Sequence, residues 1–110
     1  MGLKTVSAAI AAAVIMSVFP AYADETGLAG IHDMRREGKR VCFTDHFHYG
    51  SASGPSKKAA IAKAADSWQQ FTALEYGTSW GSWTKAASKK IGCSGAGANW
   101  SCQIEGRPCK

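Results

Sequence analysis

Hydrophobic residues are concentrated at the start of the chain, where an almost uninterrupted apolar run covers Val6–Phe19. Lys4 precedes this run, and positions 21–23 follow it with the small-x-small pattern that signal peptidase cuts after. The run is shorter than the roughly 20 residues that a membrane-spanning helix needs, and no second run follows it. Residues 1–23 are therefore predicted to be an export signal, and the protein is predicted to have no transmembrane segment.

A different pattern, in which apolar and polar residues alternate, covers residues 40–49. β-Branched and aromatic residues dominate this stretch, and a segment rich in glycine and serine at 50–54 ends it. The alternation predicts one strand over 40–49. Its apolar face would carry Val41, Phe43, Phe47 and Tyr49, and its other face Cys42, Thr44, His46 and His48.

Residues 55–76 have the periodicity of an amphipathic helix. Ser53 or Ser56 can cap its start, and Gly77 suits the left-handed position after its end. Alanines keep part of the apolar stripe thin, so that the helix can lie close to a sheet. The stripe comprises Ile61, Ala64, Ala65, Trp68, Phe71, Thr72 and Tyr76.

Residues 78–109 contain two alternating stretches around a glycine-rich turn at 94–99, which predicts a β-hairpin. The predicted apolar face comprises Trp83, Ala87, Ile91 and Cys93 on the first arm and Trp100, Cys102 and Ile104 on the second. These elements together predict an α+β fold, a small β-α-β-β domain with a three-stranded antiparallel sheet and one packed helix. Residues 24–38 have few apolar residues and are predicted to be a loose N-terminal arm, so that the domain would span 39–110.

The four cysteines are an even set, and an exported protein meets an oxidising compartment in which thiols form disulfides. Their spacing is too wide for the close ligand pairs of a zinc site. Cys93 and Cys102 lie opposite each other on the apolar side of the hairpin, whereas Cys42 and Cys109 face the other way. Side chains on opposite faces cannot reach the Cβ separation of about 3.8 Å that a disulfide needs. The alternation therefore predicts the pairs Cys93–Cys102 and Cys42–Cys109, with the strand at 40–49 beside the last strand.

The chain has 110 residues, 13 basic and 8 acidic, with a net charge of +5. Without residues 1–23 it would have 87 residues and, having lost Lys4, a net charge of +4. This length excludes a multidomain enzyme and makes disulfides necessary to a marginal core. The positive charge favours anionic partners such as an envelope polysaccharide, although solvated surfaces also explain the lysines. Nucleic acid is an improbable partner, because most of the aromatic residues are predicted to be buried.

Two histidines are the most specific candidates for chemistry. His46 and His48 lie on one face of the predicted strand, with Cβ atoms about 7 Å apart, a spacing that allows a shared Zn²⁺ or Cu²⁺. A catalytic zinc site needs a third protein ligand, and the other histidine, His32, lies in the predicted arm. The simplest interpretation is a solvated face of a half-buried strand, with no cofactor. Weak metal binding and a catalytic pair are the alternatives.

Trp80 lies in a predicted turn beside a glycine, where its ring can be exposed. With Tyr76 it is a candidate for stacking on a sugar ring or a peptide side chain, since loops often carry function. Lys57 and Lys58, at the start of the predicted helix, are candidates for contacts with an anionic partner. The remaining tryptophans have core-facing positions: Trp68, Trp83 and Trp100.

No nucleophile elbow, zinc-protease motif, P-loop or EF-hand occurs in the chain. We therefore favour a non-enzymatic binding or interaction protein for an anionic or polysaccharide partner, in the periplasm or outside the cell. The enzymatic alternative is a small ribonuclease-like phosphoesterase. In it His46 and His48 would be base and acid, and Lys57 or Arg107 would stabilise the phosphate. A weak Zn²⁺- or Cu²⁺-binding periplasmic protein is the third hypothesis.

The order of tryptophans and cysteines is also distinctive. Trp68-(x)₇-Tyr76-Gly77-(x)₂-Trp80-(x)₂-Trp83-(x)₂-Ala86 is followed by Cys93, Trp100-Ser101-Cys102 and Arg107-Pro108-Cys109. This string resembles a group of small secreted alphaproteobacterial proteins without an assigned activity, and the resemblance covers residues 41–110. It implies an exported, disulfide-bonded α+β domain, and it transfers no catalytic residue.

Overall fold

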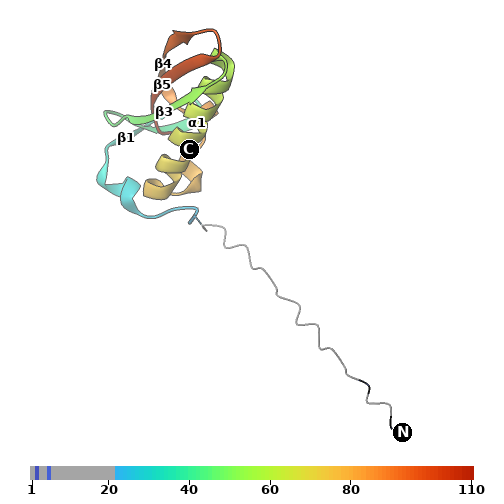
Figure 1. Cartoon of the computed structure of the whole chain (residues 1–110). Helices are drawn as coiled ribbons and strands as arrows, with labels where there is room; N and C mark the ends of the chain where they lie inside the picture. Colours follow the sequence, from blue (N-terminus) through green and yellow to red (C-terminus); the bar gives the residue numbers. More distant parts are fainter. Residues whose placement is uncertain (1, 3–4, 6–21) are drawn as a thin grey trace.

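The computed structural model describes residues 2, 5 and 22–110 (Figure 1). The predicted export signal at 1–23 lies almost entirely outside the described residues. Among the described residues, no helix has the length and apolar character needed to cross a membrane. The elements in chain order are η1 (Leu28–Ile31), β1 (Met34–Glu37), β2 (Arg40–Phe43), β3 (His48–Gly54), α1 (Lys57–Tyr76), η2 (Thr78–Trp80), η3 (Trp83–Lys85), β4 (Ala87–Ala96) and β5 (Asn99–Arg107).

The main sheet is antiparallel and has the strand order β3-β5-β4, with α1 packed across β3 and β5 (Figure 1). The predicted α+β architecture, in which the strand before the helix lies beside the last strand, is confirmed. Helix α1 begins after Ser56, whose hydroxyl oxygen accepts a hydrogen bond from the Ala59 N–H at 3.1 Å. Gly77 follows the helix with a φ of 105°, a backbone conformation that favours glycine.

The single strand predicted over 40–49 is wrong, because this stretch belongs to two different sheets. Strand β2 pairs with β1, whereas β3 begins at His48 and pairs with β5. The segment 50–54, predicted to end the strand, continues it as far as Gly54. At Gly50 the absence of a side chain is required, because a Cβ there would lie 2.8 Å from the Trp68 backbone nitrogen. Glycine therefore allows α1 to approach β3 closely.

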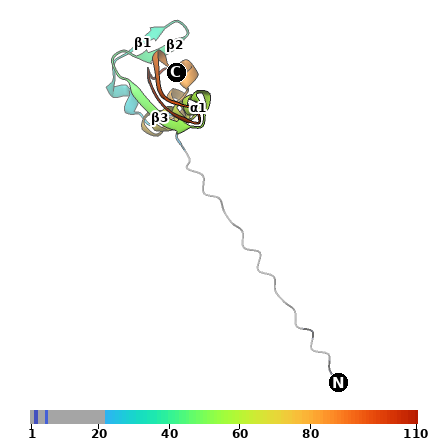
Figure 2. The ribbon, with the colours of Figure 1, turned by 45° about the horizontal axis from the view of Figure 1, so that its top comes forward.

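The N-terminal segment is not the loose arm that its composition predicts. Strands β1 and β2 form a two-stranded antiparallel sheet (Figure 2). Before it, the Thr26 N–H donates to the Tyr76 carbonyl at 3.2 Å. Ala29 is 4% exposed and belongs to a buried cluster with aromatic residues from β2 and the end of α1. The segment is ordered because a few well-placed contacts compensate for its low apolar content.

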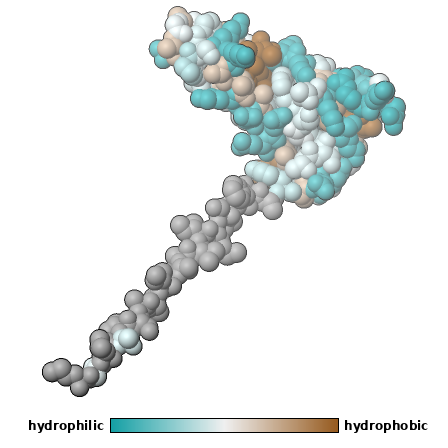
Figure 3. Space-filling view, turned by 90° about the vertical axis from the view of Figure 1, so that its right-hand side faces the viewer, coloured by the Kyte–Doolittle hydropathy of each residue, from teal (hydrophilic) through white to brown (hydrophobic). Residues whose placement is uncertain are grey.

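The covered part of the sheet is narrower than the alternating pattern predicts. Ile91 on β4 is 50% exposed, because α1 packs mainly on β3 and β5. Phe71, at the edge of the helix stripe, is 52% exposed. Trp83 lies on η3 rather than on a strand, and its ring packs against Trp68 with a centroid distance of 5.3 Å. Figure 3 shows a mostly hydrophilic face with hydrophobic residues in separate areas.

Both predicted disulfides are confirmed: Cys42 is bonded to Cys109, and Cys93 to Cys102. Cys93 and Cys102 are direct partners in the β4–β5 register. Cys42 and Cys109 are fully buried and join β2 to the C-terminal segment. The hairpin and the β2 pairing are thus each closed by a covalent bond.

Arg107 links the two sheets through a largely buried charge network. Its guanidinium donates to both carboxylate oxygens of Glu37, at 2.6 and 2.7 Å, and to the Phe43 carbonyl. It also donates to the Ser88 hydroxyl at 3.1 Å. Since Glu37 lies on β1 and Arg107 on β5, the pair ties the β1–β2 hairpin to the main sheet.

Acid is expected to weaken this link. Hydrogen bonds from Arg107 lower the pKa of Glu37 to about 2, from an ordinary value of 4.5. A lowered pKa stabilises the fold above the unfolded-state value near 4.5, and the stabilisation is lost as the pH falls towards about 2. One such carboxyl contributes at most about 1.4 kcal/mol per pH unit. Urea unfolding at a series of pH values should therefore show a shallower acid dependence for Glu37→Gln than for the unmodified protein. An equal loss of stability per pH unit in the two proteins would contradict this prediction.

Candidate metal centre

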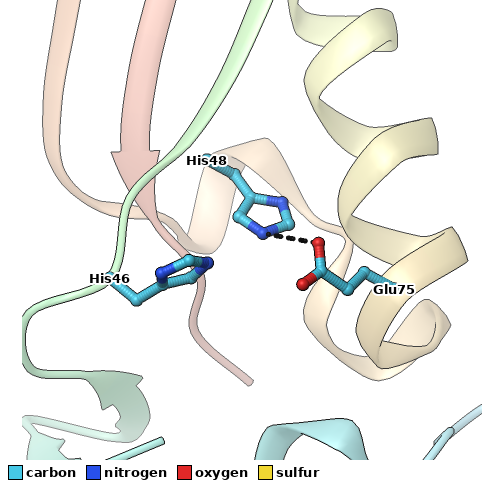
Figure 4. A group of neighbouring side chains, drawn as sticks. All are labelled: His46, His48 and Glu75. Atoms are coloured by element: carbon cyan, nitrogen blue, oxygen red, sulfur yellow. Dashed lines mark ion pairs between the residues drawn. The ribbon is translucent and has the colours of Figure 1, made fainter.

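Three potential metal ligands from separate elements meet at the C-terminal end of α1. His46 lies in the connection between β2 and β3, His48 is the first residue of β3, and Glu75 lies in the last turn of α1 (Figure 4). Their ligand atoms all lie within 4.8 Å of one another. Two imidazole nitrogens and a carboxylate are a donor set that suits divalent transition metals.

The buried His48 ring has its tautomer determined by a hydrogen-bond relay. The Thr72 hydroxyl donates to the Trp68 carbonyl at 2.7 Å, so its oxygen is free to accept. His48 Nδ1 lies 2.9 Å from that oxygen and therefore carries the proton that it donates. The other ring nitrogen, Nε2, then carries a lone pair and no proton.

This lone pair faces a carboxylate. His48 Nε2 lies 3.2 Å from Glu75 Oε2, the contact drawn as a dashed line in Figure 4. The contact is an ion pair only if His48 is protonated, but burial lowers the pKa of His48 to about 4, although the Glu75 charge opposes this. At neutral pH two acceptors therefore face each other, and His48 Nε2 has no hydrogen-bond donor among the described residues. A bound cation would turn this repulsion into attraction.

His46 supplies a second nitrogen of the same kind. Its Nε2 is buried and has no hydrogen-bond partner within the described part of the chain. Burial, followed by the nearby His32 ring, lowers the pKa of His46. Both imidazoles are thus neutral near pH 7, which is the form that binds a metal ion.

His32 completes the surroundings of the site, although the sequence placed it in a loose arm. Its ring stacks on His46 with a centroid distance of 4.3 Å. Its Nε2 lies 2.9 Å from the Tyr76 hydroxyl. Burial raises the pKa of Tyr76, so the phenol keeps its proton at neutral pH.

The sequence reasoning missed Glu75 as a partner of the histidines. Thr72, Glu75 and Tyr76 have the three- and four-residue spacing that puts side chains on one helical face. That spacing is the available signal, and it does not show which strand the face meets.

The predicted ligand-stacking residues are buried and cannot contact a ligand as predicted. Trp80 is 1% exposed, because Phe43 stacks on its ring with a centroid distance of 4.6 Å. Tyr76 is fully buried beneath the N-terminal segment and β2. The solvated histidine face is also wrong, since His48 is 2% exposed and His46 is half-buried.

The basic residues of the phosphoesterase hypothesis do not gather at the histidines. Lys57 and Lys58 are exposed at the start of α1, about 27 Å along the helix from Glu75 at 1.5 Å per residue. Arg107 is 5% exposed and bound to Glu37. The structure therefore brings together a metal-ligand set and separates the phosphate-binding set.

The chain matches no protein-family model, and neither the curated proteins nor the solved structures contain a significant match to it.

Proposed function

From these contacts alone, we propose that the protein binds one divalent transition-metal ion, Zn²⁺ or Cu²⁺, through His46, His48 and Glu75. The observation that carries the proposal is the 3.2 Å approach of His48 Nε2 to Glu75 Oε2. The Thr72 relay makes the nitrogen an acceptor, and burial opposes its protonation. His46 Nε2, which has no hydrogen-bond partner among residues 22–110, adds the third donor.

The distances suit a small ion. Donors bound tetrahedrally to Zn²⁺ at about 2.1 Å lie about 3.4 Å apart, close to the separation of His48 and Glu75. The ligand atoms lie within 4.8 Å of one another, so His46 closes the site with a small movement of its loop. Three protein ligands leave a fourth position for water or an exogenous group.

A hydrogen-bonded outer partner supports the same proposal. Histidine ligands usually donate their second N–H to an acceptor that orients the ring. Here His48 Nδ1 donates to Thr72 Oγ1, and this hydroxyl is oriented by the Trp68 carbonyl. The ring would therefore need no rearrangement to bind the ion.

The cellular setting is part of the proposal. The predicted signal at 1–23, together with two disulfides, supports a periplasmic or secreted protein. An anionic or polysaccharide partner stays a prediction from charge, with the exposed Lys57 and Lys58 as its candidate contacts.

Calorimetric titration of the metal-stripped protein with ZnCl₂ and CuCl₂ tests the proposal. We expect one ion per chain with sub-micromolar affinity, and tighter binding of Cu²⁺ than of Zn²⁺. Thr72→Val, which removes only the outer partner, should weaken binding about 10- to 100-fold. His46→Ala and Glu75→Gln remove ligands and should weaken it further.

The matched control is Glu105→Gln, which neutralises a carboxylate that pairs with Lys90. Glu105 lies opposite Tyr49 in the β3–β5 register, so its side chain lies on the other face of the sheet from His48. It should bind the ions as the unmodified protein does. Binding no tighter than that of a free histidine peptide, or binding that the ligand variants leave unchanged, would overturn the proposal.

A further inference from the structure

The N-terminal segment, residues 24–33, contacts two residues of the candidate metal site, His46 and Glu75. Resting on the proposed metal function, we infer that His32 is a positioning residue for His46 and that docking of this segment is coupled to metal binding. Docking of the segment would then orient the ligands before the ion binds, and the bound ion would in turn stabilise the docked segment.

The first contact of the N-terminal segment is with His46. This ligand lies outside regular structure, between the end of β2 and the start of β3, so β-pairing does not orient it. The His32 ring lies on it at 4.3 Å with an interplanar angle of 24°. The other aromatic rings around His46 meet it edge-on, at centroid distances of 5.1 to 6.0 Å. His32 therefore covers the flat face of His46.

The connection that carries His46 is held by the same segment. The Thr44 N–H donates to the Asp33 carbonyl at 3.0 Å, and the Thr44 hydroxyl lies 3.3 Å from the same oxygen. Asp33 directly follows His32, so one short stretch restrains both the ring of His46 and the backbone before it.

A separate set of contacts holds the backbone at Glu75, the residue that supplies the carboxylate ligand. The Thr26 hydroxyl donates to the Glu75 carbonyl at 2.6 Å, and the Thr26 N–H donates to the Tyr76 carbonyl at 3.2 Å. These are carbonyls of the last helical turn, which accept no hydrogen bond within the helix. Thr26 thereby secures the turn from which Glu75 extends.

The N-terminal segment is anchored in the hydrophobic core. Tyr76 is fully buried, and its hydroxyl lies 2.9 Å from His32 Nε2. Ala29 packs into the cluster that Tyr76 forms with Phe43 and Trp80. Buried groups thus determine the orientation of the His32 ring. The stacked ring in turn restricts the orientation of His46.

Coupling of this kind is reciprocal. If docking of the segment strengthens metal binding by some factor, metal binding must stabilise docking by the same factor. An outer partner that hydrogen-bonds to a histidine ligand is worth about 10- to 100-fold in metal affinity, and we expect the stacked His32 ring to be worth a similar factor.

The test compares His32→Ala, His32→Phe and Ile31→Ala. Ile31→Ala is the matched control, because Ile31 is the neighbouring residue and is 78% exposed. Zn²⁺ affinity should fall about 10- to 100-fold in His32→Ala. His32→Phe retains a flat ring and should keep most of the affinity.

The second measurement is amide hydrogen exchange with and without ZnCl₂. The reporters are the Gly30 and His32 N–H groups, which donate within η1 to the Gly27 and Ala29 carbonyls. Zn²⁺ should slow their exchange in the unmodified protein and in Ile31→Ala, and much less in His32→Ala.

Unchanged Zn²⁺ affinity in His32→Ala, or equal slowing of exchange in that variant, would overturn the coupling and leave the metal site standing. Absence of Zn²⁺ binding to the unmodified protein would overturn both proposals.

Discussion

Replacing both Cys42 and Cys109 with alanine is expected to lower the free energy of unfolding by roughly 4 kcal/mol. The bond joins residues 67 positions apart, so its loss frees most of the folded chain in the unfolded state. The same model assigns roughly 3 kcal/mol to a bond that spans 9 positions, as Cys93–Cys102 does. A small domain has only about 5 to 15 kcal/mol of stability, so either loss is severe.

Packing adds to the difference between the two bonds. Cys42 and Cys109 are fully buried against Ala87, whereas Cys93 is half-buried on the edge strand β4. Alanines at 42 and 109 would therefore also leave a cavity.

Urea unfolding of Cys42→Ala/Cys109→Ala, with Cys93→Ala/Cys102→Ala as the matched control, measures both effects. The prediction fails if the control pair loses as much stability as the buried pair.

Gly50→Ala is expected to cost about 3 kcal/mol or more, because it inserts a methyl group where backbone meets backbone. The new Cβ would lie 2.8 Å from the Trp68 nitrogen and 2.9 Å from its Cβ, and closer still to the Ala64 carbonyl oxygen. Such atoms cannot turn aside as the end of a flexible side chain can, so α1 must move away from β3.

That movement would also reach the candidate metal site. His48 precedes Gly50 on β3, and its ring depends on Thr72, one helical turn after Trp68. Weaker Zn²⁺ binding should therefore accompany the lower stability of Gly50→Ala.

Gly92→Ala is the control for the Gly50 variant, since a Cβ at Gly92 would have no neighbour within 4 Å. Thermal unfolding should show a large drop in melting temperature for Gly50→Ala and little change for Gly92→Ala. Similar melting temperatures for the two variants would refute the close-packing argument.

Interactions between residues near in sequence were predictable. Cys93 and Cys102 face each other because alternation with period two decides which side of a hairpin each residue occupies. Ser56 caps α1 because its hydroxyl oxygen reaches a backbone N–H three residues ahead. Both require knowledge of only one element and its turn.

The strand at 40–49 shows where this reasoning ends. Its alternation continues through Thr44–Phe47, yet the pairing partner changes there from β1 to β5. A pattern of polar and apolar residues states which residues share a face, and it does not identify the neighbouring strand. The bend between β2 and β3 follows from that change of partner.

The same distinction separates the components of the candidate site. The chain sequence was sufficient for the H-x-H pair, the helix that carries Glu75 and the Cys93–Cys102 bond, because each depends on local periodicity. Burial of His48, burial of Trp80 and the meeting of His46 with Glu75 depended on long-range packing. Docking of residues 24–33 and of α1 covers those side chains. Residues far along the chain decide which face of an element is buried. Periodicity within the element does not contain that information.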